Sequence, residues 1–176
     1  MNKTLSASPM TRRAFLVSCS ALSCVACGWE TPAAPTRDQL LAQAPVRITD
    51  PQNSAVLLTP DILVRGTFAP STLTDDIWLI VWPAEAGGKG YHQSPNAAVG
   101  EPCVVDRQNQ RWSVPTGLGG PPQAYEISVH TADAAASRAM RDFLIEWART
   151  GIFVGLSREQ LPVGLVERHR IAITRR

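Results

Sequence analysis

The chain has 176 residues, and its 17 basic and 15 acidic side chains give a formal net charge of +2. Three basic residues, Lys3, Arg12 and Arg13, lie in the first 13 positions, whereas every acidic residue follows position 26. Without residues 1–26 the chain has 14 basic and 15 acidic side chains, a net charge of −1, which argues against a nucleic-acid partner because such a partner requires a basic surface.

Residues 1–26 have the pattern of an export signal. The basic residues are followed by an apolar run of 13 residues and then by small residues. This run is shorter than the ~20 residues of a membrane-spanning helix, so we expect it to be removed. Arg12 and Arg13, followed by Phe15 and Leu16, resemble the twin-arginine export motif, which implies transport of the folded chain across a bacterial inner membrane.

The end of this segment resembles the lipobox of bacterial lipoproteins. Residues 25–28 read Val-Ala-Cys-Gly, and the resemblance implies that Cys27 is acylated and becomes the mature N-terminus. Cys24 stands where the motif usually has Leu, and a lipobox ending at Cys19 would leave too short an apolar stretch. We therefore predict Cys27 as the lipidated residue; the alternative is an ordinary cleavable signal that yields a soluble periplasmic protein.

The cysteine spacing also allows a different interpretation. Cys19, Cys24 and Cys27 are spaced as three ligands of a plant-type iron–sulfur cluster, with Cys103 as the fourth. An apolar run behind paired arginines is a poor setting for a cluster, so this alternative is disfavoured. After cleavage Cys103 has no partner for an intramolecular disulfide, and we expect no cofactor and no metal.

Residues 27–45 are predicted to form a flexible tether, because Pro32, Pro35 and Pro45 oppose regular structure there. A domain over residues 46–176 follows. Short strands separated by Pro- and Gly-containing turns are predicted at residues 46–49, 55–58, 62–68, 76–82, 103–105, 112–114, 125–131 and 166–174.

Three of these strands carry distinctive patterns. Residues 62–68 alternate, with Ile62, Val64, Gly66 and Phe68 on one face. Residues 76–82 are apolar on both faces, which predicts a central strand. Residues 125–131 alternate, and this places Ser128 and His130 on a polar face.

One segment has helical periodicity. Asp133 can cap a helix over residues 134–150, and Gly151 can end it. We expect this helix to cover one edge or end of the β structure with an apolar stripe made of Ala136, Met140, Phe143, Leu144 and Trp147.

The strand pattern predicts a mainly β fold, an antiparallel β-sandwich. Residues 48–51 (Ile-Thr-Asp-Pro), residues 64–67 (Val-Arg-Gly-Thr) and the strands centred on Trp78 and Trp112 resemble an immunoglobulin-like module of bacterial envelope proteins. So does the Leu-Pro-Val-Gly turn at residues 161–164. The resemblance implies an immunoglobulin-like sandwich with an adhesion, scaffolding or binding role. The helix inserted before the last strand and the missing disulfide depart from the pattern.

No catalytic motif is evident, because the G-x-S-x-G, H-E-x-x-H and Walker-type patterns are absent from the sequence. Residues 87–90 (Gly-Gly-Lys-Gly) superficially resemble a phosphate loop, but a polar tract follows where a helix should begin. The histidines His92, His130 and His169 are scattered and are expected to be solvated, and Asp76 is expected to be a solvated turn residue. We therefore expect a protein that is not an enzyme.

The loop after residue 82 is the candidate binding site, through Lys89, Tyr91, His92 and Gln93. The alternative is that Tyr91 packs on the sheet as an edge-strand residue. A second basic edge contains four C-terminal arginines, which either meet anionic lipid or protect a strand edge: Arg168, Arg170, Arg175 and Arg176.

The expected function is a non-catalytic, membrane-tethered envelope lipoprotein, facing the periplasm, that binds or scaffolds a protein partner. One alternative is an accessory subunit of a larger periplasmic enzyme. Another is a small metal-binding or redox protein that uses Cys103 and His92.

Overall fold

The computed structural model describes residues 45–69 and 75–176. The predicted signal residues Arg12, Arg13, Phe15, Leu16 and Cys27, and the tether up to residue 44, lie outside the described residues. The described elements are β1 (Val46–Asp50), β2 (Val56–Leu57), β3 (Asp61–Phe68), β4 (Asp76–Pro83), η2 (Ala84–Ala86), β5 (Tyr91–Gln93), β6 (Val104–Asp106), β7 (Arg111–Gly117), β8 (Ala124–Ala132), α2 (Ala134–Thr150), η3 (Arg158–Gln160) and β9 (Leu165–Arg175).

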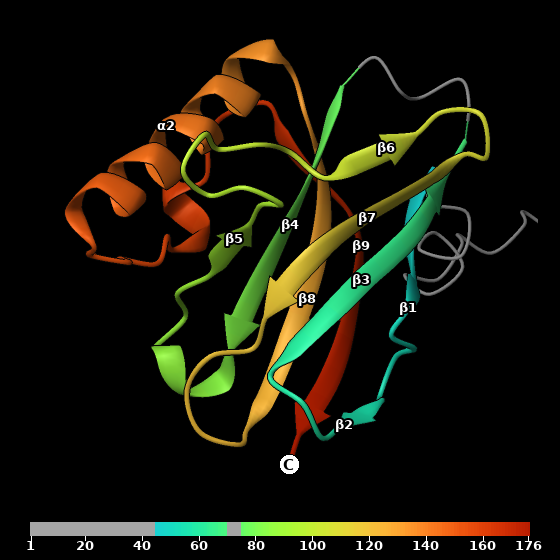
Figure 1. Cartoon of the computed structure of the whole chain (residues 1–176), viewed down its shortest axis with the longest axis vertical. Helices are drawn as coiled ribbons and strands as arrows, with labels where there is room; N and C mark the ends of the chain where they lie inside the picture. The colour runs from blue at the N-terminus through green and yellow to red at the C-terminus, as the bar shows by residue number, and fades with distance from the viewer. Residues whose placement is uncertain (1–44, 70–74) are drawn as a thin grey trace, which may run out of the picture. The chain divides into compact units, whose positions relative to one another are not determined.

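The strands form two sheets, so the prediction of a mainly β fold with one helix before the last strand is confirmed (Figure 1). One sheet has the order β1-β3-β7-β6 and the other β2-β9-β8-β4-β5. Neighbouring strands are antiparallel, with one exception among the described pairs: Val56 and Leu57 of β2 run parallel to Thr174 and Arg175 of β9. The expectation of a purely antiparallel fold is wrong at that pair.

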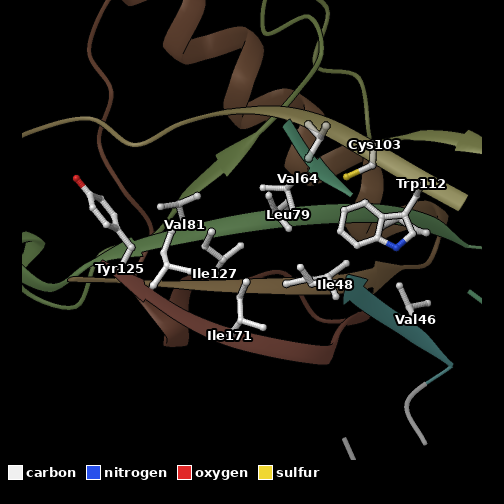
Figure 2. Packing of buried hydrophobic residues seen from close by; sticks show 14 of the residues in the cluster. Val46, Ile48, Val64, Leu79, Val81, Cys103, Trp112, Tyr125, Ile127 and Ile171 are labelled. Carbon is white, nitrogen blue, oxygen red and sulfur yellow. The ribbon is translucent and has the colours of Figure 1, made fainter. Parts of the chain in front are cut away.

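The inner faces of the two sheets enclose an apolar core. On β3 the alternation of side chains buries Val64, Gly66 and Phe68 and exposes the residues between them, as predicted from the period of two. Figure 2 shows side chains of this core between the strands. Its buried members are Val46, Ile48, Val64, Phe68, Ile77, Leu79, Val81, Cys103, Trp112, Val114, Leu118, Tyr125, Ile127, Val129, Ile171 and Ile173.

The helix α2 has the predicted bounds and caps. The Asp133 carboxylate accepts hydrogen bonds from the backbone N–H groups of Ala135 and Ala136 at 2.9 and 2.8 Å. Gly151 ends the helix with a φ of 69°, a left-handed conformation that favours glycine, and its N–H donates to the Trp147 carbonyl.

The predicted position of α2 at an edge or end is wrong, because the helix covers the outer face of the five-stranded sheet (Figure 1). The outer side of β4 carries Trp78, Ile80 and Trp82, which require an apolar cover. A helix of 17 residues is ~26 Å long, close to the ~27 Å of an eight-residue strand, and Leu156, Leu161 and Leu165 from the segment after it complete the cover. The buried members of this second core are Trp78, Ile80, Trp82, Ala132, Ala136, Met140, Leu144, Trp147 and Leu156.

Trp78 therefore does not fill the space between the sheets. That position is taken by Trp112 of β7, which is 2% exposed. Gly66 of the neighbouring strand leaves room for the indole, since a Cβ atom there would lie 2.3 Å from the Trp112 ring.

The chain enters the domain at one end of the sheets. Val46 pairs with Phe68 at this end, and the strands that begin at the other end include β8, which starts at Ala124 (Figure 1). Asp61 of β3 pairs with Gly117 at that far end. The connection between β7 and β8 thus lies at the end opposite Val46.

Candidate binding site

A cleft of about 780 Å³ lies at the end opposite Val46. Three segments meet there: the β4–β5 connection, the β7–β8 connection and the chain after α2. Glu85 is the one charged side chain among the described residues that line it, and most of its other side chains are apolar. The lining residues are Val81, Pro83, Glu85, Ala86, Tyr91, Gly117, Gly119, Gly120, Pro121, Gln123 and Phe153.

Hydrogen bonds hold two of these walls together. The Tyr125 hydroxyl lies at the start of β8 and donates to the Gly119 carbonyl at 2.8 Å, so the β7–β8 connection folds back onto the strand. The Gln123 side-chain oxygen accepts from the backbone N–H of Glu85 at 2.9 Å and joins that connection to η2. The cleft is therefore preformed, as small-molecule and peptide sites usually are.

The segment after α2 forms an apolar rim beside the cleft, which we call the rim and define as Ile152, Phe153 and Val154. These side chains are 63%, 59% and 50% exposed. Phe153 lines the cleft and stacks edge-on against Trp147 with 6.1 Å between ring centres. The rim was not among the predicted site residues, although the apolar triplet between Gly151 and Gly155, outside any predicted element, could have indicated it.

The rim is fixed to the five-stranded sheet. Gly90, just before β5, and Leu156 exchange two backbone hydrogen bonds of 2.8 and 2.9 Å. Both Gly90 and Gly155 lie in close contact with neighbours, and a Cβ atom at either position would meet heavy atoms at 2.7–2.8 Å. Gly90 thus allows close packing, whereas Gly87 and Gly88 have no neighbour within 4 Å and adopt positive φ angles of 61° and 79°. A strand follows this segment where a phosphate loop requires a helix.

The structure separates the four predicted binding-loop residues. Tyr91 lies on β5, an edge strand paired with β4, and it also lines the cleft. Gln93 links the two sheets, because its side-chain oxygen accepts from the Gly117 N–H at 3.1 Å. Lys89 is exposed next to Gly155. His92 points to the opposite face of β5, into the core under the helix.

His92 is not solvated, contrary to expectation. Its Nε2 atom donates to the Met140 carbonyl at 3.0 Å, and its ring lies 4.6 Å from the Trp147 ring, centre to centre. Burial lowers the pKa of His92 from the ordinary 6.5 to about 4, although the hydrogen bond to Met140 opposes this. The imidazole is therefore neutral at pH 7, and it holds α2 against the sheet through its contacts with Met140 and Trp147.

A second buried histidine belongs to a chain of polar side chains on the outer face of the five-stranded sheet. The Ser128 hydroxyl accepts from the Trp82 indole N–H at 2.8 Å and lies 2.9 Å from His130 Nε2. Ser128 and His130 are 0% and 2% exposed, so this pair has hydrogen-bond geometry but no access for a substrate. Burial lowers the pKa of His130 to about 4, while the nearby Glu167 carboxylate raises it. The expectation of a solvated His130 is wrong as well.

Asp76 belongs to a second hydrogen-bonded chain between the sheet and α2. It is half-buried, so the expectation of a solvated turn residue is wrong. Trp78 donates its indole N–H to the Ser137 hydroxyl at 3.1 Å, and Ser137 donates to the Asp76 carboxylate. His169, the third histidine, is half-buried and its Nδ1 atom lies 3.4 Å from the Ile48 N–H.

Cys103 lies in the core between the sheets, close to Trp112 in Figure 2. Burial raises the pKa of its thiol, which keeps it protonated and unreactive. Cys103 lies in the core between the sheets whereas His92 lies against α2, so the structure does not bring these two side chains together. Within residues 45–69 and 75–176 no three His, Cys, Asp or Glu side chains are grouped to hold a metal ion.

Three of the C-terminal arginines make internal contacts, and one of them, Arg175, donates to the Gly120 carbonyl. Arg170 forms ion pairs with Glu126 at 3.0 Å and with Glu167. Arg168 donates to the Thr131 hydroxyl at 2.8 Å. Arg158 of η3 pairs with Glu126 and lies 4.1 Å above the centre of the Trp82 ring.

No protein-family model and no curated protein matches this chain. In the part of the chain that the structure describes, no helix has the length and apolar character that crossing a membrane requires.

Proposed function

We propose that this protein is a non-catalytic binding module of the bacterial cell envelope, exported through its twin-arginine motif and tethered to a membrane through acylated Cys27. Binding takes place at the cleft and its rim. This assignment combines the N-terminal sequence pattern with the geometry of the described domain.

The observation that carries the proposal is the cleft itself. It has the size, the largely apolar lining and the few polar groups that are typical of binding sites. The groups best suited to chemistry, namely Ser128, His130, His92 and Cys103, are buried away from it. A binding role thus accounts for the accessible surface better than a catalytic one.

We further propose that the domain is immunoglobulin-like. The order β1-β3-β7-β6 corresponds to strands A, B, E and D of that fold, and β9-β8-β4 corresponds to G, F and C, with β5 as the extra strand of variable-type domains. Tyr125 supports the same assignment, because a tyrosine near the start of strand F whose hydroxyl bonds to the preceding connection is typical of these domains. The helix between β8 and β9 and the tryptophan on β7 are departures from the common pattern.

The intact mass and N-terminal peptide of the protein from a membrane fraction test the tether, with Cys27→Ala as the matched variant. We expect a diacylglycerol-bearing Cys27 that is lost in the variant. An unmodified chain that starts elsewhere would indicate a soluble periplasmic protein. Retention of Cys19, Cys24 and Cys27 with bound iron would replace the proposal with the iron–sulfur alternative.

The cleft is tested by filling it. Gly119 lines the cleft and a Cβ atom there meets no heavy atom within 4 Å, so Gly119→Trp should block the cleft without unfolding the domain. Val163→Trp is the control, because Val163 is 96% exposed. We expect an apolar fluorescent probe to bind the wild type and the control, and to bind Gly119→Trp at least about tenfold more weakly. Equal binding by all three would contradict the cleft as the site.

A further inference from the structure

The rim is unusual among the exposed apolar side chains of the described domain because its three members are consecutive. Val163 and Leu58 are more exposed, at 96% and 80%, but each stands alone in the sequence among the large exposed apolar side chains. Single exposed apolar residues need no explanation, whereas a contiguous apolar patch marks a site of interaction with a protein or a membrane.

Basic side chains flank the rim. Arg149 precedes it at the end of α2, and Arg158 follows it in η3, with no acidic residue between them in the sequence. Lys89 is exposed, and its Cβ lies 2.8 Å from where a Cβ of Gly155 would be. Arg149 is 68% exposed and forms an ion pair with Glu146, which is 54% exposed. An apolar tip with flanking cations complements an anionic lipid surface.

The rim is also held in place before any partner binds. The bonds between Gly90 and Leu156 fix its C-terminal side to the sheet, and the contact of Phe153 with Trp147 fixes it to the helix. A preformed contact surface loses little conformational entropy on binding.

We propose that the rim is a membrane-contact site: Ile152, Phe153 and Val154 enter the interface of an anionic bilayer while Lys89 and Arg149 meet its phosphate headgroups. This rests on the proposed function and names the partner of its site. A stable protein interface buries ~800 Å² on each side, far more than three loop side chains offer, whereas a bilayer needs only a few apolar side chains and cations. The tether between Cys27 and Val46 has 18 residues and reaches at most ~60 Å, enough for the domain to lie with its rim on the membrane.

Vesicle sedimentation tests this with the chain that begins at Gly28, which has neither acyl group nor signal and retains every described element. The vesicles contain either phosphatidylglycerol with phosphatidylethanolamine or phosphatidylcholine alone. We expect the wild type to sediment with the anionic vesicles, and the triple variant Ile152→Ser, Phe153→Ser, Val154→Ser to bind them at least about tenfold more weakly. Val163→Ser is the matched control for loss of an exposed apolar side chain and should bind as the wild type does.

A second pair of measurements examines the charge. Lys89→Glu should weaken binding to the anionic vesicles about fivefold, and added salt should weaken wild-type binding, because ~1 kcal/mol is expected for each basic residue near the surface. A thermal melt of each variant shows whether it is folded.

Two results would overturn the inference: no sedimentation of the folded wild type with anionic vesicles, or equal sedimentation of the wild type and the triple variant. The first result would favour a protein partner at the cleft. Neither result bears on acylation of Cys27, which the mass measurement decides separately.

Discussion

The two cores of this domain, one between the sheets and one between the five-stranded sheet and α2, differ in the polar side chains that they bury. The core between the sheets consists mainly of apolar side chains, and its buried polar groups are the Cys103 thiol and the hydroxyls of Thr116 and Thr131, none of which is a histidine. The core under α2 contains, beside its tryptophans, the buried polar side chains of His92, Ser128, His130 and Ser137. The first interior is insensitive to pH, and the second depends on neutral histidines and on matched hydrogen bonds.

This difference follows from how each interior is closed. The inner core is closed by strands that are joined by backbone hydrogen bonds. The register of each strand pair fixes which apolar side chains lie next to one another. The outer core is closed by α2, whose Met140 carbonyl bonds to His92 and whose Ser137 bonds to Trp78, and by Leu156, Leu161 and Leu165 from the segment after it. The outer core is thus the part of the domain that solution conditions can loosen.

The largest effect is expected in the inner core. Trp112→Ala removes a 2% exposed indole and leaves a cavity beside Gly66, which should lower the free energy of unfolding by about 3–5 kcal/mol. Urea unfolding followed by circular dichroism measures the loss. Val104→Ala on the adjacent β6 is the control, because that side chain is 57% exposed and its loss should cost less than about 1 kcal/mol. Similar losses in both variants would show that Trp112 is not a core residue.

The next largest effect on the free energy of unfolding is expected from a change of pH. It distinguishes the two cores, because the buried histidines lie in the outer one. His92 and His130 have a pKa of about 4 in the folded protein against an ordinary 6.5, so between these values the unfolded chain binds more protons. Their contribution to stability is therefore complete above pH 6.5 and is lost as the pH falls towards 4. At pH 4.5 each histidine should have lowered the free energy of unfolding by about 2 kcal/mol relative to pH 7.

Substitution assigns this pH dependence to its source. In His92→Phe the aromatic packing is kept and the titration is removed, so the loss between pH 7 and pH 4.5 should shrink by about 2 kcal/mol. Hydrogen exchange should show that the amides of α2 lose protection at pH 4.5 before those of β3 and β7 do. Two results would contradict the idea that acid loosens the outer core first. One is that the amides of α2, β3 and β7 lose protection together, and the other is that His92→Phe has the same pH dependence as the wild type.

The sequence was sufficient for the parts of this comparison that depend on local patterns. The apolar faces of β4, the alternation on β3, and the bounds and caps of α2 were all predicted, because each depends only on the spacing of neighbouring residues.

The position of α2 was predicted wrongly, because the polar residues Ser128 and His130 suggested that this face of β8 is solvated. In the structure Trp78 pairs with His130 and Ile80 with Ser128, so polar and apolar side chains share the face under the helix. That register is a long-range property which no local pattern contains. The cleft was missed for the same reason, since three distant segments form it.

A smaller effect is expected at the start of α2. Asp133→Ala removes the acceptor for the N–H groups of Ala135 and Ala136, and should lower the free energy of unfolding by about 1 kcal/mol. Asp142→Ala is the control on the exposed side of the same helix and should change it by less than about 0.5 kcal/mol. Thermal unfolding of both variants checks this, and an equal response would mean that the cap contributes nothing.

The smallest effect is expected at the far end of the outer core, where Arg158 covers Trp82. The guanidinium lies 4.1 Å above the ring and pairs with Glu126, but its side chain is 41% exposed, so water screens both contacts. Arg158→Ala should lower the free energy of unfolding by only about 0.5 kcal/mol, and Arg158→Lys by less. The quenching of tryptophan fluorescence by acrylamide should nevertheless increase in Arg158→Ala, because the face of Trp82 loses its cover. An unchanged quenching constant would show that α2 and Leu156 already exclude solvent from that ring, and that Arg158 is a surface ion pair without a part in closing the outer core.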